Sequence, residues 1–163
     1  MAIDETHVIL AELLQLRPYY NVATVKDGEP WNSPIWAARD ERFNLYWSSW
    51  KQAVHSTNIV ANSHAFLTLY DSTRERGTNN FRCLYLQCNV VEVTEETEAF
   101  KAASLLYQGE AFDLSDFQGA GLKRFYRATP VRDWLNSLSE RQLTPDTIKM
   151  RLELSLEDLR SAT

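Results

Sequence analysis

The residues between positions 45 and 59 are of types that could bind an anion. A run of strand-forming residues ends in the hydroxyls of Ser48 and Ser49, and Lys51, His55 and Asn58 follow where a helix is expected to begin. Hydroxyls, a cation and the free backbone N–H groups of a helix N-terminus together favour a phosphate or a carboxylate. In a simpler interpretation Ser49 caps the helix, and Lys51 and His55 are surface neighbours. Both interpretations fit the spacing.

Common catalytic signatures are missing from the rest of the sequence. It has no Gly-x-Ser-x-Gly, no phosphate loop ending in Gly-Lys-Ser/Thr, no His-Glu-x-x-His and no Gly-x-Gly-x-x-Gly. The histidines are scattered, and the two cysteines lack zinc-binding spacing, so we predict no metal site and assign no catalytic residue. Cys83 and Cys88 lie at odd spacing in one expected strand, which predicts two buried thiols on opposite faces and favours a reducing compartment.

The elements that must position these residues are mostly strands. We predict an amphipathic helix over 5–17 and a hairpin over 19–39 that turns at Asp27-Gly28, with Pro34 marking an edge or a bulge in its second strand. Further strands are predicted over 43–48, 65–70, 81–93, 130–135 and 148–154, and helices over 51–61, 95–106 (capped by Thr94), 122–127 and 156–160. Six or seven short strands without βαβ alternation predict a mainly β (α+β) fold, an antiparallel barrel with peripheral helices.

Length and charge narrow the possibilities further. The 163 residues fit one domain over 1–163, and 44% hydrophobic with 24% charged residues is an ordinary globular composition. The net charge is −5 and no Lys/Arg-rich block occurs, which argues against a nucleic-acid partner. No signal peptide and no apolar run long enough to span a membrane is visible, so a cytoplasmic protein is expected.

The order of these motifs resembles the FMN-binding split-barrel family, the pyridoxamine-phosphate-oxidase-like proteins. The resemblance covers about residues 19–107, with a weaker echo over 129–134. The matching segments are Asp27-Gly28-Glu29-Pro30, Ser33-Pro34-Ile35-Trp36, Leu45-Tyr46-Trp47-Ser48-Ser49, His55-Ser56-Thr57-Asn58-Ile59 and Leu84-Tyr85-Leu86-Gln87. The resemblance implies a split β-barrel, FMN as cofactor and a homodimer with two flavin sites at its interface.

The resemblance also implies roles for particular residues. The flavin phosphate would be held by Ser48, Ser49, Lys51, His55 and Asn58. The isoalloxazine ring would lie beside Ser33, Pro34, Ile35 and Trp36. Trp36 and Trp47 would each either contact the ring or serve ordinary barrel packing. Arg132 and Trp134 would reach a flavin from the partner chain or serve ordinary strand packing.

Two departures from the family pattern bear on function. Thr57 stands where members often carry a basic residue, and the full set of pyridoxal-phosphate-binding residues is missing. We therefore expect a flavin-dependent oxidoreductase of unknown substrate. The alternatives are a non-catalytic flavin carrier or sensor, and a split barrel that binds another ligand such as F420 or haem.

Overall fold

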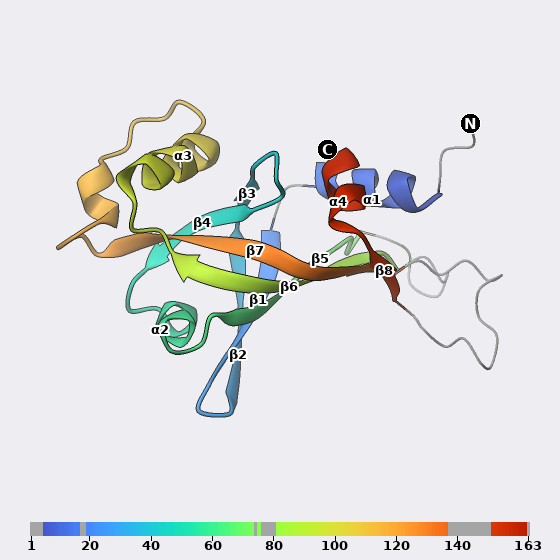
Figure 1. The fold of residues 1–163 in the computed structure, drawn as a ribbon, viewed down its shortest axis with the longest axis horizontal. Helices are drawn as coiled ribbons and strands as arrows, with labels where there is room; N and C mark the ends of the chain where they lie inside the picture. Colours follow the sequence, from blue (N-terminus) through green and yellow to red (C-terminus); the bar gives the residue numbers. More distant parts are fainter. Residues whose placement is uncertain (1–4, 17–18, 74, 76–80, 137–150, 163) are drawn as a thin grey trace.

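The computed structural model describes residues 5–16, 19–73, 75, 81–136 and 151–162 (Figure 1). Its strands are β1 (Tyr19–Lys26), β2 (Glu29–Trp36), β3 (Ala38–Arg39), β4 (Leu45–Trp50), β5 (His64–Tyr70), β6 (Cys83–Glu92), β7 (Lys123–Leu135) and β8 (Leu152–Leu154). Its helices are α1 (Glu5–Gln15), α2 (Val54–Ala61), α3 (Glu96–Tyr107) and α4 (Leu156–Ser161), with a short 3₁₀ helix at Leu114–Phe117.

The strands form one antiparallel sheet that closes on itself. Its order is β2-β1-β5-β6-β7-β4-β3, and β8 pairs with β7. β2 and β3 stand at opposite ends of this order, yet only the buried Ala37 separates them in the chain. One segment therefore changes partners at Ala37, from β1 to β4, and joins the two edges of the sheet.

The barrel is split on the other side of this junction. From Glu29 to Trp36, β2 pairs only with β1, while the last residues of β4, Trp47–Trp50, pair only with β7. The two strands thus share no hydrogen-bonded ladder there, and an opening remains between them. The structure is an antiparallel split β-barrel with peripheral helices, as the sequence predicts.

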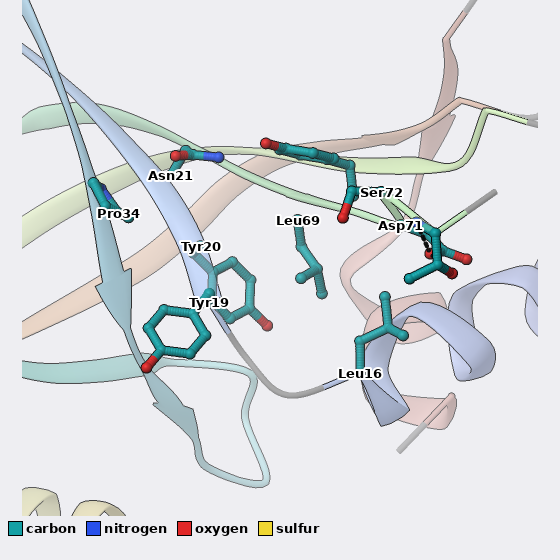
Figure 2. A pocket seen from close by; sticks show the side chains of 10 residues that line it. Leu16, Tyr19, Tyr20, Asn21, Pro34, Leu69, Asp71 and Ser72 are labelled. Carbon is teal, nitrogen blue, oxygen red and sulfur yellow. Dashed lines mark hydrogen bonds between the residues drawn. The ribbon is translucent and has the colours of Figure 1, made fainter. Parts of the chain in front are cut away.

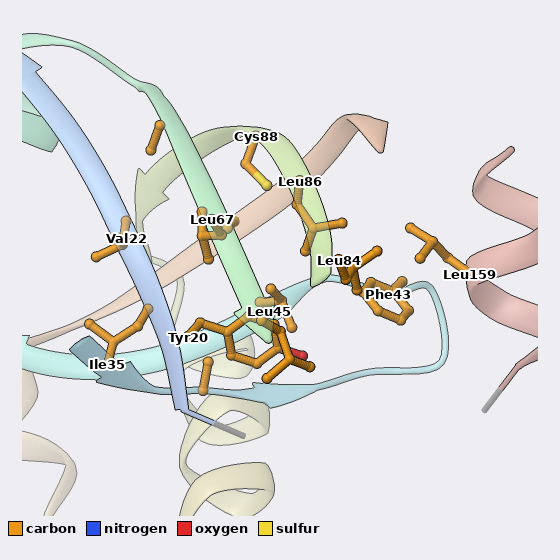
Figure 3. Packing of buried hydrophobic residues seen from close by; sticks show 14 of the residues in the cluster. Tyr20, Val22, Ile35, Phe43, Leu45, Leu67, Leu84, Leu86, Cys88 and Leu159 are labelled. Atoms are coloured by element: carbon orange, nitrogen blue, oxygen red, sulfur yellow. The ribbon is translucent and has the colours of Figure 1, made fainter. Parts of the chain in front are cut away.

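Alternation along the strands separates the core from the outer face. In β1 and β5 every second residue is buried, and these residues include Tyr20, Val22, Leu67 and Leu69. Side chains from α1 and α4, among them Leu159, complete the same cluster (Figure 3). A second, smaller cluster joins α3 and the 3₁₀ helix to the outer face of β4 and β7, and its buried members are Tyr46, Val93, Ala99, Ala102, Ala103, Phe117 and Phe125.

Three local expectations from the sequence are wrong. The helix predicted over 122–127 is the first half of β7, which pairs with β4 on one side and β6 on the other. Thr94 does not cap α3, because the N-cap residue is Glu95 and it forms no side-chain cap. Ser49 does not cap α2, whose N-cap is Ala53. The predicted strand over 148–154 lies partly outside the described residues, and its described part forms β8.

The two cysteines agree with their prediction. Cys83 and Cys88 are free, buried thiols. Cys88 belongs to the inner core cluster, whereas Cys83 does not, consistent with side chains on opposite faces of β6.

Asp133 is an acidic side chain enclosed by the barrel. It lies on β7 opposite Leu86 and Leu154, is 1% exposed, and its Oδ2 atom accepts no hydrogen bond. Burial raises the pKa of its carboxyl to about 6, and the nearby charges of Asp158 and Glu153 act in the same direction. The ionised form is therefore disfavoured in the folded state.

We expect Asp133→Asn to stabilise the protein at pH 8. The folded carboxyl, with a pKa of about 6, holds its proton more tightly than the unfolded one at 3.8. The contribution of this carboxyl to the free energy of unfolding therefore falls as pH rises from about 4 to about 6, by about 2–3 kcal/mol in total. The neutral amide of the variant removes this loss, so urea unfolding should show a more stable variant at pH 8 and little difference at pH 4. The exposed Asp116→Asn serves as control, and a variant less stable than wild type at pH 8 would contradict the assignment.

Candidate functional site

The opening between β2 and β4 is occupied by α2. A tight turn leads from β4 into the helix, in which the Ala53 N–H donates to the Trp50 carbonyl at 3.0 Å. The Lys51 N–H donates to the Leu122 carbonyl at 3.0 Å and so attaches the turn to the loop before β7. Figure 1 shows α2 beside the part of the β1–β2 hairpin that leads to its turn. The helix N-terminus therefore lies at the end of β4.

His55 connects the two sides of the split. Its Nδ1 lies 3.1 Å from the Ser33 Oγ on β2, and its Nε2 lies 2.9 Å from the Ser49 Oγ on β4. The indole Nε1 of Trp31 donates to the Ser33 Oγ at 3.0 Å. One imidazole thus holds β2, α2 and β4 together through three hydrogen-bonded side chains.

The imidazole of His55 is largely buried, and this determines its charge. Burial lowers the pKa of His55 below its ordinary value, so the neutral ring dominates near neutral pH. A neutral imidazole has one donating and one accepting nitrogen, and each serine hydroxyl can take either role. Both ring nitrogens are therefore satisfied without a charged partner.

Asn58 lies one helical turn deeper and is buried. Its Nδ2 donates to the Thr24 Oγ1 on β1 at 3.1 Å. This amide attaches α2 to the floor of the split, and of the five residues predicted to hold a phosphate it lies farthest inside.

Lys51 and the two serines lie at the end of β4. Ser49 faces the split and His55, whereas Ser48 lies on the opposite face of the strand. The Lys51 ammonium forms no hydrogen bond or ion pair with any described residue. The guanidinium of Arg124, paired with Ser49 in the sheet, is instead engaged with Glu92 at 3.0 Å and with loop carbonyls. Lys51 is therefore available to an anion at this end of the strand.

The four predicted ring contacts on β2 lie on two different faces. Ser33 and Ile35 point toward the barrel, where Ser33 meets His55 and Ile35 joins the core. Pro34 points outward and lines a cavity of about 400 Å³ with Tyr19 and Asn21 (Figure 2). Trp36, also outward, lines a hollow of about 350 Å³. Only Ser33 of the four is brought together with the residues of α2 and β4.

Trp47 packs inside the barrel. It is 0% exposed and its ring stacks on Tyr126 with centroids 5.5 Å apart. Of the two roles considered for Trp47, the structure supports barrel packing.

Two residues of the site were not selected from the sequence. Trp31 and Thr24 face each other across the β1–β2 hairpin and support Ser33 and Asn58 respectively. The signal was present in the alternation of β2, since Trp31 stands two residues before Ser33 and so shares its face.

Comparison with known proteins shows likeness in structure only. No protein-family model matches the sequence, and no curated protein matches it. A haem-binding protein from Mycobacterium smegmatis superposes with a TM-score of 0.72 at 10% identity, over 99% of this chain and 62% of that one. A candidate pyridoxamine 5'-phosphate oxidase from Listeria innocua superposes with a TM-score of 0.60 at 13% identity, over 80% of this chain and 96% of that one. An FAD-binding protein from Mesorhizobium loti superposes with a TM-score of 0.58 at 18% identity, over 77% of this chain and 90% of that one.

The chain has the fold of the pyridoxamine-phosphate-oxidase-like split barrels. This split barrel covers about three fifths of the length of the Mycobacterium smegmatis protein and nearly all of the Listeria innocua one. Within the described ranges, no helix is long and apolar enough to cross a bilayer.

We expect His55→Ala to loosen the split. The change removes the hydrogen bonds to Ser33 and Ser49 and leaves a cavity, which should lower the free energy of unfolding by about 2 kcal/mol at pH 8. Urea unfolding measures this loss, and hydrogen exchange of the β1–β2 hairpin should become faster.

The effect should depend on pH. Because the pKa of folded His55 is lowered from 6.5, the contribution of His55 to the stability of wild type falls as pH drops below about 6.5, and the variant has no such contribution to lose. The difference between the two should therefore shrink in acid. The exposed His64→Ala is the matched control, and equal stability of His55→Ala and wild type at pH 8 would remove the bridging role.

Proposed function

We propose that the protein binds a flavin nucleotide, FMN, at the split, with its phosphate at the end of β4, and acts as a flavin-dependent oxidoreductase. The observation that carries this proposal is the meeting of three anion-binding features at one place. These are the Lys51 ammonium, which pairs with no described residue, the Ser49 hydroxyl, and the N-terminus of α2. The Ser48 hydroxyl, on the other face of β4, is not part of this group.

The helix N-terminus is suited to a phosphate. The N–H groups of the first turn of an α-helix have no intrahelical partner, and in α2 the N-cap residue Ala53 supplies no side chain to accept from them. These groups and the helix dipole favour negative charge, and Lys51 adds a full positive charge beside them. No acidic residue stands in the first turn of α2 to oppose the phosphate.

The hydrogen-bonded chain through His55 orients Ser49 for this role. Trp31 donates to the Ser33 Oγ, and the two ring nitrogens of His55 contact the Ser33 and Ser49 hydroxyls. In the tautomer whose Nε2 carries the ring proton, Ser49 accepts from His55 and its own hydroxyl proton is free for a phosphate oxygen.

In this proposal the flavin supplies the redox chemistry when bound. The chain positions it and excludes water, and none of its residues has to act as an acid or a base. This agrees with the lack of catalytic signatures in the sequence.

Haem is the second candidate ligand. Two observations favour it: the cationic charge at the end of β4 comes from Lys51 while His55 is neutral, and a structural neighbour over 99% of this chain is described as haem-binding. A porphyrin carries no phosphate group, so its binding requires less positive charge at the end of β4 than the binding of a flavin nucleotide.

A flavin titration of wild type and Lys51→Ala tests the proposal. Wild type should take up FMN with two visible absorption bands. Lys51→Ala should weaken binding by about 1.5–3 kcal/mol, roughly 10- to 100-fold, because it removes a charge-assisted contact. Lys26→Ala, on the exposed hairpin end, is the control. An unchanged dissociation constant would refute the role of Lys51, and a Soret band with haemin but no flavin uptake would favour haem.

We also propose that two copies associate through the outer face of the sheet from β2 across β1, β5 and β6 to β7. This outer face carries aromatic side chains that belong to neither core cluster, namely Tyr19, Trp36, Phe66, Tyr70, Tyr85 and Trp134. Phe66 lies at its centre, 6.1 Å from the Trp134 ring and 6.3 Å from the Tyr85 ring. Arg132 and Arg151 cover the rings of Trp134 and Tyr85, and aromatic residues with arginine are typical of interface cores.

We expect Phe66→Glu to yield a monomer. A carboxylate at the centre of the outer face would be buried without a partner in the dimer and exposed to water in the monomer. Light scattering after gel filtration measures the mass. Phe100→Glu places the same charge on the exposed side of α3, away from this face, and should leave the dimer intact. A monomeric wild type would overturn the proposal.

A further inference from the structure

The end of β4 carries an exposed indole just beyond the proposed phosphate cluster. Trp50 is 56% exposed, although it is the last residue of a strand whose other Trp is fully buried. Its carbonyl accepts from Ala53, so one turn separates it from the start of α2. It lies on the opposite face of β4 from Ser49, because adjacent strand residues alternate.

One ammonium group lies over this indole, and a second lysine follows the indole in the chain. The Lys123 Nζ lies 5.5 Å from the centroid of the Trp50 ring and 5.6 Å from that of the Phe117 ring, and Lys51 is the next residue after Trp50. The chain as a whole has a net charge of −5, so this pair of cations stands against the general trend of the surface. An exposed indole at a strand end that carries two lysines is suited to an aromatic ring that carries phosphate groups.

Hydrogen bonds and close packing hold the loop that precedes β7. The Arg124 guanidinium donates to the carbonyls of Gly119 and Gly121 at 2.7 Å each while pairing with Glu92. Gly121 passes so close to the backbone carbonyls of Ser115 and Asp116 that a Cβ atom has no room. The loop therefore keeps its shape and holds Leu122, 58% exposed, next to Lys51.

We propose that Trp50 stacks on the adenine ring of a flavin dinucleotide, so that the flavin nucleotide at this site is FAD. This inference rests on the proposed function, since FMN is the half of FAD that would occupy the split. FMN ends at its phosphate, at the end of β4. A ligand that continues past that phosphate crosses the strand end over Lys51 and meets the Trp50 ring on the other face. The two phosphates of the dinucleotide then match the two ammonium groups, Lys51 and Lys123.

The test compares FAD and FMN on wild type and Trp50→Ala. Wild type should bind FAD about tenfold more tightly than FMN, the scale of one base–aromatic stack. Trp50→Ala should weaken FAD binding about tenfold and leave the FMN dissociation constant within about twofold. Trp50→Tyr keeps a stacking ring and should retain most of the advantage of FAD. Phe100→Ala removes an equally exposed aromatic side chain from α3 and should change neither constant.

The outcomes separate the two proposals. Equal binding of FMN and FAD by wild type, or an equal loss of both in Trp50→Ala, overturns the dinucleotide assignment while the proposed function stands. Failure of both flavins to bind overturns the proposed function and the assignment with it. An advantage of FAD that survives in Trp50→Ala also overturns the role of Trp50.

Discussion

The change of strand partner at Ala37 is the constraint from which the rest of the structure follows. Because one segment pairs with β1 before Ala37 and with β4 after it, the sheet closes without a separate closing strand. The same bend directs the rest of β2 away from β4, so closure on one side requires an opening on the other. A small side chain suits this position, since Ala37 is buried where the segment bends and a larger one would strain the crossing.

Helix α2 fills the opening between β2 and β4, and two of its buried polar side chains, His55 and Asn58, form hydrogen bonds there. Ser33, His55 and Ser49 satisfy one another, and Asn58 is satisfied by Thr24. A neutral imidazole is well suited here, because a buried ion pair would carry a large desolvation penalty. The other end of the barrel is different. There Asp133 is enclosed near the acids Asp158 and Glu153, with one oxygen unpartnered. The side chains of Ser33, His55, Ser49 and Asn58 at the split are thus hydrogen-bonded, whereas the buried carboxyl of Asp133 near α4 has its ionised form disfavoured.

Local signals in the sequence were sufficient for some elements and not for others. The hairpin at Asp27-Gly28 was predictable because a two-residue turn of this kind requires positive φ at both positions, and Asp and Gly are residue types that tolerate it. The observed φ values are 53° and 82°. The first half of β7 was not, because its strand state comes from pairing with β4 and β6, which are distant in sequence. The cluster of serines, Lys51 and His55 was predictable as a group. The bridge from His55 to Ser33 was not, because it depends on how the barrel closes at Ala37.

Alternation along β4 explains why neighbouring residues have different roles. Leu45, Trp47 and Ser49 face inward, so Trp47 is buried in the core and Ser49 contacts His55. Tyr46, Ser48 and Trp50 face outward, and only the first of them is covered by α3. A one-residue shift in register would bury Trp50 and expose Trp47, so pairing with β7 decides which indole meets solvent. The strand end therefore offers a hydroxyl to the split on one face and an aromatic ring to the outside on the other, with Lys51 between them.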